Sequence, residues 1–290
     1  MQTNLNRLEL LKEVVKEKEV KDIITKNNLQ PEEIDANLNT FLAFSLRNKK
    51  CSNCKGLENC QQKDRGYRPS LSYGALRCDI NYIECDYLLN EQENEQKENN
   101  LKIISSGLQN HNLENIYVNA ARNSVLTSIK TCISNYENNV PTKGLYIHGK
   151  HGTGKSYLLS FIAKTFANNN HEVILAYYPD LARNFRSSIA SGTLEDLIEE
   201  LKNVEILALD DFGGETLTAY IRDEVIGSIL HDRMCNNRLT FIASNLSDTM
   251  LQKHLEDTGK DIDVVKAARI YERIRALMNF VELVDTNYRD

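Results

Sequence analysis

The sequence is poor in glycine and proline, and it has no long apolar run. Its 290 residues include 13 Gly and 4 Pro, too few for a collagenous or low-complexity protein. No run approaches the ~20 apolar residues that span a bilayer, and the polar start Met1–Arg7 lacks the apolar core of a signal peptide. These absences exclude fibrous, membrane and exported classes. We therefore expect a cytoplasmic globular protein, of about two domains at this length.

Positive charge is not in excess either. The chain has 35 Lys and Arg against 41 Asp and Glu, a formal net charge of −6, with 41% hydrophobic and 26% charged residues. That composition is ordinary for a globular protein. Because the overall field is mildly acidic, any contact with DNA must come from a local basic patch.

Cysteine is present but unevenly distributed. Five of the seven cysteines fall within 35 residues, which in a reducing compartment indicates a metal site before disulfides. These five are Cys51, Cys54, Cys60, Cys78 and Cys85. Cys51 and Cys54 have the spacing of a zinc knuckle, and tetrahedral Zn²⁺ needs two further ligands. The remaining two, Cys132 and Cys235, are expected to be ordinary core residues.

The chain changes in composition near residue 100. Residues 1–48 have helical apolar spacing, and the cysteine segment that follows includes two short stretches with β-type alternation, Ser70–Tyr73 and Asp79–Ile83. Residues 91–100 contain no apolar residue, with four Glu and one Lys, which is typical of a linker or an exposed helical connector. The expected organisation is an N-terminal domain at 1–90, a linker at 91–104 and a C-terminal domain at 105–290.

Beyond the linker, apolar strands alternate with amphipathic helices, and the strands are apolar on both faces. This pattern predicts an α/β domain with a five-stranded parallel sheet covered by helices. The expected strands are Gly144–His148, Val173–Tyr177, Val204–Leu209, Leu239–Ala243 and Val281–Val284.

The most specific motif lies between the first of these strands and a helical segment. Gly149-Lys-His-Gly-Thr-Gly-Lys-Ser156 matches the phosphate-binding pattern G-x4-G-K-[ST]. Its glycines let backbone N–H groups turn toward phosphate oxygens, and the following helix N-terminus adds free donors. Lys155 would reach the β- and γ-phosphates of ATP, and the Ser156 hydroxyl would bind Mg²⁺. The expected ATP-binding residues are Gly149, His151, Gly152, Thr153, Gly154, Lys155, Ser156 and Tyr157.

Polar residues also follow two other strands. Asp210 and Asp211 come directly after one strand, and Asn245 follows the next. Ligands of open α/β sheets bind at the carboxyl ends of the strands. We expect Asp210 to hold Mg²⁺ together with Ser156, and Asp211 to orient or activate the attacking water. An amide at Asn245 could contact the γ-phosphate or that water; the alternative is an acidic strand end and an ordinary turn.

Together these motifs resemble the bacterial replicative-helicase loaders of the DnaC/DnaI type, which are AAA+ ATPases of the replication-initiator clade. The resemblance includes the C-terminal segment Ala267–Arg275, and the cysteine module around Lys63–Leu71 is similar to the DnaI branch. It implies an AAA+ P-loop ATPase preceded by a small, mostly helical zinc-binding domain. The implied partners are the hexameric replicative DNA helicase, gripped by the N-terminal domain, single-stranded DNA, and a second copy of the chain.

The resemblance adds roles that spacing alone does not give. Arg273 matches the arginine-finger region and would reach the ATP of a neighbouring subunit. Asn245 matches the sensor-1 position, and Arg289 resembles a second sensor that contacts the nucleotide. Taken from the residues alone, the arginines near Arg273 would instead form a solvated helix face paired with Glu272.

For the metal, the resemblance implies a histidine where this chain has Tyr67, and no histidine precedes His111. A cysteine must therefore replace it. Cys85 matches the late cysteine of the family, and the fourth ligand is Cys60 or Cys78, with Cys60 favoured. The alternative is a set of unrelated buried cysteines.

The segment Pro179–Leu201 lies where the initiator clade carries an extra helix that contacts single-stranded DNA. Arg183 and Arg186 are candidate phosphate contacts, and Phe185 is a candidate for stacking on a base. A basic helix face with a core Phe explains the same residues equally well.

The favoured function is an ATP-dependent loader of the replicative helicase onto single-stranded DNA, a primosome component acting in replication initiation or restart. Its slow ATP hydrolysis would serve as a switch. One alternative is an accessory AAA+ ATPase of transposition, which has no need of a zinc-bearing helicase-binding domain. Another is a non-catalytic ATP-gated adaptor, which has no need of Asp210, Asp211 and Arg273.

Overall fold

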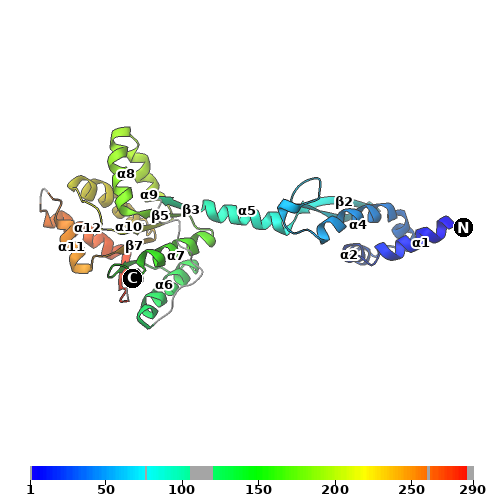
Figure 1. The fold of residues 1–290 in the computed structure, drawn as a ribbon, viewed down its shortest axis with the longest axis horizontal. Helices are drawn as coiled ribbons and strands as arrows, with labels where there is room; N and C mark the ends of the chain where they lie inside the picture. Colours follow the sequence, from blue (N-terminus) through cyan, green and yellow to red (C-terminus); the bar gives the residue numbers. More distant parts are fainter. Residues whose placement is uncertain (1, 76, 105–119, 260–261, 286–290) are drawn as a thin grey trace. The chain divides into compact units, whose positions relative to one another are not determined.

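The computed structural model describes residues 2–75, 77–104, 120–259 and 262–285. These residues form two compact units, which divide between Glu95 and Gln96 (Figure 1). The first unit is mostly helical, and the second is an α/β unit.

The first unit consists of helices and one β-hairpin. Its elements are α1 (Gln2–Val14), α2 (Lys18–Asn27), α3 (Pro31–Ala36), α4 (Leu38–Ser52), the 3₁₀ turn η1 (Leu57–Asn59), β1 (Tyr67–Gly74), β2 (Arg77–Glu84) and the start of α5 (Asp86–Asn99). The strands pair antiparallel, from Tyr67 opposite Glu84 to Gly74 opposite Arg77. Both short strands expected from the sequence therefore lie within one longer hairpin. Residues 91–99 are helical and mostly exposed.

The hairpin packs on α2 and α4, and a small apolar core lies between them. The buried members of this core are Val14, Val20, Leu29, Phe41, Phe44 and Cys78. Asn37, only 4% exposed, accepts the N–H of Cys78 at 2.7 Å and donates to the carbonyl of Glu33 at 2.8 Å. A buried amide satisfied on both sides ties the hairpin to the junction of α3 and α4.

The second unit is built on one parallel sheet. Its strands are β3 (Leu101–Ile104), β4 (Gly144–His148), β5 (Val173–Tyr177), β6 (Ile206–Asp210), β7 (Thr240–Ser244) and β8 (Met278–Glu282), in the spatial order β3-β5-β6-β7-β4-β8. The expectation of five strands is wrong by one. The extra strand, β3, is four residues long and carries Lys102, and it pairs with β5 from Leu101 opposite Val173. Such a short strand directly after a polar segment has too little alternation to be recognised.

Helices cover both faces of this sheet. They are α6 (Ala120–Glu137), α7 (Lys155–Asn168), α8 (Tyr178–Ser191), α9 (Leu194–Asn203), the π-helical turn η2 (Ile221–Ile226), α10 (Gly227–Cys235), α11 (Asp248–Glu256) and α12 (Val264–Leu277). Within the described ranges, no helix combines the length and the apolar character needed to cross a bilayer.

The side chains of β4 show how the two layers form. Leu145 and Ile147 point into a core with α6 and α7, whereas Tyr146 points into a second core with α8 to α12. Successive strand residues face opposite sides of a sheet, so a strand apolar on both faces fits this double covering. Figure 1 shows α6 and α7 on one side of the sheet and α8 to α12 on the other.

Two expectations about core residues have different outcomes. Cys132 is buried, at 4% exposure, in the core under α6 and α7. Cys235 is exposed, so its expected place in the core is wrong. It is the last residue of α10, where the helix ends and the chain returns to solvent.

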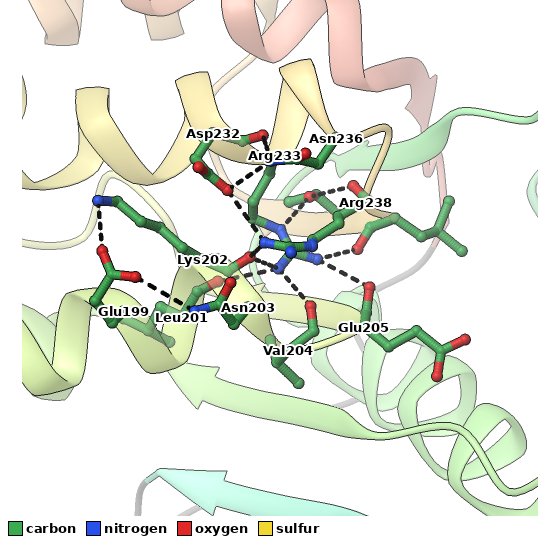
Figure 2. Close-up of polar contacts among 12 residues, drawn as sticks. Glu199, Leu201, Lys202, Asn203, Val204, Glu205, Asp232, Arg233, Asn236 and Arg238 are labelled. Carbon is green, nitrogen blue, oxygen red and sulfur yellow. Dashed lines mark hydrogen bonds and ion pairs between the residues drawn. The ribbon is translucent and has the colours of Figure 1, made fainter.

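A fully buried arginine joins the layers at the edge of the sheet where β6 and β7 begin. Arg233 of α10 donates to the carbonyls of Leu201, Val204 and Leu239 at 3.0, 2.8 and 2.6 Å, and to the Thr240 hydroxyl at 2.9 Å. Figure 2 shows its guanidinium among the last turn of α9 and the starts of β6 and β7. Burial lowers the pKa of Arg233 to about 9. Among the described residues, neutral acceptors hold this cation: backbone carbonyls and the hydroxyl of Thr240.

Candidate nucleotide site

The phosphate loop lies between β4 and α7, where the sequence motif places it. At two positions of the loop, a neighbouring atom occupies the space that a side chain would need, so glycine is required there. A Cβ at Gly149 would lie 2.3 Å from the carbonyl oxygen of Leu283, and one at Gly154 would lie 2.6 Å from Nη2 of Arg122. Gly154 also has φ +90, a left-handed conformation that side chains disfavour. The loop is therefore shaped by its neighbours as well as by its own sequence.

Lys155, the first residue of α7, is held over the loop. Its ammonium donates to the carbonyls of Gly149 at 3.0 Å and Lys150 at 2.7 Å, and the residue is only 8% exposed. An ammonium at a helix N-terminus, beside free backbone N–H groups, forms an anion-binding position. His151 lies exposed on the loop, and Tyr157 is half-buried in α7.

The structure brings Ser156 and Asp210 together. The Ser156 hydroxyl donates to Oδ1 of Asp210 at 3.0 Å, and Asp210, the last residue of β6, is 4% exposed. Burial raises the pKa of Asp210 to about 6, against the opposing effect of the hydrogen bond from Ser156. A buried carboxylate next to a hydroxyl is a pair of hard oxygen donors, the kind that Mg²⁺ prefers.

Asp211 is fixed by two donors. The Tyr177 hydroxyl donates to its Oδ2 at 3.1 Å, and the Asn245 amide donates to its Oδ1 at 2.8 Å. Asp211 also has φ +55, an unusual conformation for a residue other than glycine. The strand ends thus hold this carboxylate in one orientation.

Tyr177 is a site residue that the sequence reasoning missed. It ends β5 and stands opposite Asp210 in the register of β5 and β6. Burial raises the pKa of Tyr177, and the charge of Asp211 raises it further, so the phenol stays a donor. The signal that could have found it is positional, since parallel strands end at the same edge of a sheet and polar residues there meet.

Arg273 is bonded within its own chain. Its Nη1 donates to the carbonyl of Gly227, the first residue of α10, at 2.6 Å. Arg275, on the same helix α12, pairs with Asp248 at 3.3 Å and lies 5.0 Å from the ring centre of Phe280. The side chain of Arg273, a residue of α12, therefore bonds to the start of α10. Arg289 lies outside the described residues.

The basic residues of α8 are exposed, but the aromatic one is not. Arg183 pairs with Asp180, and Arg186 donates to the carbonyl of Thr216 at 2.7 Å. Phe185 has 0% exposure and belongs to the core beneath α8. Of the two interpretations of Phe185, a residue that stacks on a base or a core residue beneath a basic helix face, the structure bears out the core residue.

The cysteines of the first unit separate into one buried residue and four partly exposed ones. Cys78 is 1% exposed in the apolar core, and burial raises the pKa of its thiol, which disfavours the thiolate that a metal needs. The other four are Cys51, Cys54, Cys60 and Cys85. Among the described residues, no three metal-ligating side chains are assembled around one point.

Two hydrogen bonds involve Cys51 and Cys54. The Cys51 sulfur accepts from Gln62 at 3.2 Å, and the Tyr87 hydroxyl donates to the carbonyl of Cys54 at 3.4 Å. Figure 1 shows the loop between α4 and β1 beside the start of α5, where Cys85 lies. The four thiols come from three chain segments, which are the end of α4, the loop before β1, and the junction of β2 with α5.

Comparison with known proteins gives matches over both units. The family described as "Primosomal protein DnaI N-terminus" matches residues 2–82, and the family described as "Bacterial DnaA ATPAse domain" matches residues 108–256. The second match covers the phosphate loop and all three polar strand ends.

Individual relatives agree with these family matches. The replicative helicase loader DnaI of Bacillus subtilis is 31% identical over 98% of this chain and 93% of that protein. The replicative helicase loader DnaC of Escherichia coli is 25% identical over 53% of this chain and 62% of that protein. A crystal structure of DnaI superposes with a TM-score of 0.57 at 33% identity, over 65% of this chain and 100% of that one.

Proposed function

Because the chain belongs to the DnaI-type family of replicative helicase loaders, with an AAA+ ATPase domain related to DnaA, we propose that ATP switches its loading activity. In this proposal it places the hexameric replicative helicase on single-stranded DNA, in the cytoplasm, during replication initiation or restart. The observation that carries the proposal is the constellation at one sheet edge, where the phosphate loop, Asp210 and Asp211 lie together.

ATP would bind with its phosphates on the loop Gly149–Ser156 and the N-terminus of α7. Lys155 would exchange its two loop carbonyls for β- and γ-phosphate oxygens. Ser156 and Asp210 would hold Mg²⁺, which neutralises phosphate charge. Asp211, aligned by Tyr177 and Asn245, would orient the attacking water.

Arg273 would act on the ATP of a neighbouring copy. This requires it to leave the carbonyl of Gly227, so self-association and release of that bond are linked. An arginine supplied in trans stabilises the charge of the transferring phosphoryl group. Because Arg273 would act only on a neighbouring copy, we expect slow ATP hydrolysis by the isolated chain. Arg289 would act as a second sensor that contacts the nucleotide.

The first unit would bind the helicase, with Zn²⁺ held by Cys51, Cys54, Cys60 and Cys85. Four thiolates suit a closed structural zinc site, and the bond from Tyr87 to the carbonyl of Cys54 joins the loop that carries Cys54 to the helix that follows Cys85. Cys60 is preferred to Cys78 as a ligand because Cys78 is a core residue. The ion would join segments that lack a common hydrophobic core.

Arg183 and Arg186 of α8 are the proposed contacts to single-stranded DNA, through phosphates only. Both are exposed, and Arg186 reaches the loop that follows Asp211. Replacing both with Ala should weaken single-stranded DNA binding and flatten its salt dependence, by a slope of about 0.7 per lost phosphate contact. An unchanged affinity and slope would remove these residues from the DNA interface.

Co-purification with the host replicative helicase tests the loader proposal directly. The full chain should retain the helicase, and a fragment of residues 96–290 should bind nucleotide without retaining it. If that fragment still retains the helicase, the first unit is not the helicase-binding part. If the full chain does not retain it, the loader proposal fails for this helicase.

A further inference from the structure

The phosphate loop has a support that lies outside it. Arg122, near the start of α6, has a side chain that is 4% exposed. Its Nη2 donates to the carbonyl oxygen of Thr153 at 2.6 Å, and its Nε pairs with the carboxylate of Asp285, which is 3% exposed. One guanidinium therefore joins the phosphate loop to the segment that follows β8.

The bond to Thr153 sets the direction of a peptide plane. In a trans peptide the carbonyl and the next N–H point in opposite directions. When Arg122 holds the carbonyl of Thr153, the N–H of Gly154 is turned away from Arg122. Gly154 is a loop residue whose N–H belongs to the set that this motif offers to phosphate. Arg122 thus orients a phosphate-binding N–H of the loop without contacting the phosphate itself.

The loop is also fitted to this side chain. A Cβ at Gly154 would lie 2.6 Å from Nη2 of Arg122, so the glycine leaves the space that the guanidinium occupies. Thr153 is 2% exposed, and its hydroxyl donates to the carbonyl of Lys150 at 2.9 Å. Thr153 therefore makes two bonds that fix the loop. Its hydroxyl bonds within the loop, and its carbonyl bonds to Arg122 of α6.

We propose that Arg122 is a positioning residue for nucleotide binding, and that Asp285 holds it in place. The proposal rests on the proposed ATP-binding function and deepens it. Because one guanidinium bonds to both Thr153 and Asp285, nucleotide that orders the loop also favours the bound position of the segment after β8. Coupling of this kind is reciprocal.

A purely structural role would give a different set of results. A buried ion pair that only supports folding loses stability when one partner is removed, and regains it when both are replaced by apolar residues. The nucleotide affinity of the folded protein would then be the same in every variant. The experiment therefore measures the melting temperature and the nucleotide Kd of each variant separately.

The first variants are Arg122→Met and a matched control, Arg222→Met, in the full chain. Arg222 is also buried, at 1%, and pairs with Asp223 while donating to the carbonyl of Leu255. Calorimetric titration with Mg²⁺ and ADP or ATP should give a Kd raised about tenfold or more for Arg122→Met. Arg222→Met should lower the melting temperature and leave the Kd of folded protein within about twofold.

Two further variants separate positioning from folding. Asp285→Asn keeps the bond from Arg122 to Thr153, so its Kd should stay within about threefold although its melting temperature falls. The double variant Arg122→Met with Asp285→Leu should recover much of the melting temperature but keep the weakened nucleotide binding. These two measurements decide the question even where Arg122→Met alone does not fold.

Two outcomes would overturn the role of Arg122: an unchanged Kd in Arg122→Met, or a Kd restored in the double variant. A melting temperature unchanged in Asp285→Asn would remove the supporting role of Asp285. Failure of the proposed function is distinct from these. In that case the unmodified chain itself would bind neither ADP nor ATP with Mg²⁺.

Discussion

The residues of the candidate sites are brought together in different ways in the two units of the chain. In the second unit, the ends of parallel strands and the start of α7 bring Ser156, Asp210, Asp211 and Asn245 into direct contact. In the first unit, the four partly exposed cysteines come from the end of α4, a loop, and the junction of β2 with α5. A sheet edge positions ligands through its own packing, whereas segments without a common core need the ligand itself to join them.

The largest expected effect concerns the zinc proposed for the first unit. The native protein should carry about one equivalent of zinc, because structural zinc contributes on the order of 10 kcal/mol to folding. Cys54→Ser should lose that zinc and the stability of the first unit, with nucleotide binding by the second unit unchanged. Cys78→Ser is the control, since a core cysteine should leave the zinc content intact. Elemental analysis showing less than about half an equivalent in native protein would contradict the site.

The next effect concerns Lys155 in the second unit. Lys155→Ala should reduce ATP turnover about 100-fold or more, because the phosphates lose the ammonium placed at the helix N-terminus. A steady-state assay of phosphate release measures this. Lys164→Ala, on the same helix beyond the loop, is the control. Wild-type turnover in Lys155→Ala would show that the loop is not the nucleotide site.

Asp210 provides a test that depends on pH. Burial raises the pKa of Asp210 to about 6, above that of a carboxyl in the unfolded chain. The folded state therefore favours the protonated form, and the stability that this form contributes is lost as the pH rises through 6. Asp210→Asn should therefore be more stable than the native chain at pH 8, by up to about 3 kcal/mol. The difference should vanish below about pH 4. Denaturant unfolding at several pH values gives this comparison.

The control for Asp210 has the opposite sign. Asp223 has a lowered pKa despite its partial burial, because Arg222 and Lys266 bond to its carboxylate. Asp223→Asn should therefore lose stability at neutral and higher pH and lose nothing once the carboxylate is protonated in acid. If both variants responded alike, burial of Asp210 would not be the cause.

The smallest effect is expected at Tyr177. Tyr177→Phe removes one of the two hydrogen bonds to Asp211 and should lower ATP turnover about fivefold, with nucleotide Kd unchanged. Tyr178→Phe is the control, because the buried Tyr178 hydroxyl has no hydrogen-bond partner among the described residues. Unchanged turnover in Tyr177→Phe would leave Asn245 alone to orient Asp211.

Much of the second unit could be predicted from its sequence. β4 and β5 have the predicted bounds, Gly144–His148 and Val173–Tyr177, because uninterrupted apolar runs between polar turns are strong strand signals. The phosphate loop, Asp210 and Asn245 followed from motif and strand position. What could not be predicted is β3, where four residues pair only because β5 offers an edge.

The missed residues share a physical reason. Tyr177 and Arg122 act through contacts with residues far away in the sequence, Asp211 and Asp285, and no local pattern distinguishes them. The choice left open at Phe185 has the same cause. Its flanking arginines indicate an exposed helix, but only the packing of α8 on the sheet shows that this position faces inward.

Arg233 has a consequence for how the second unit opens. Its guanidinium bonds to the carbonyls of Leu201 in α9, of Val204 between α9 and β6, and of Leu239 just before β7. The end of α9 therefore cannot separate from the starts of these strands without leaving a buried cation unsatisfied. Partial unfolding of α9 should therefore coincide with loss of the sheet centre. In native-state hydrogen exchange, the last turn of α9 should exchange as slowly as the core strands and as one cooperative unit with them.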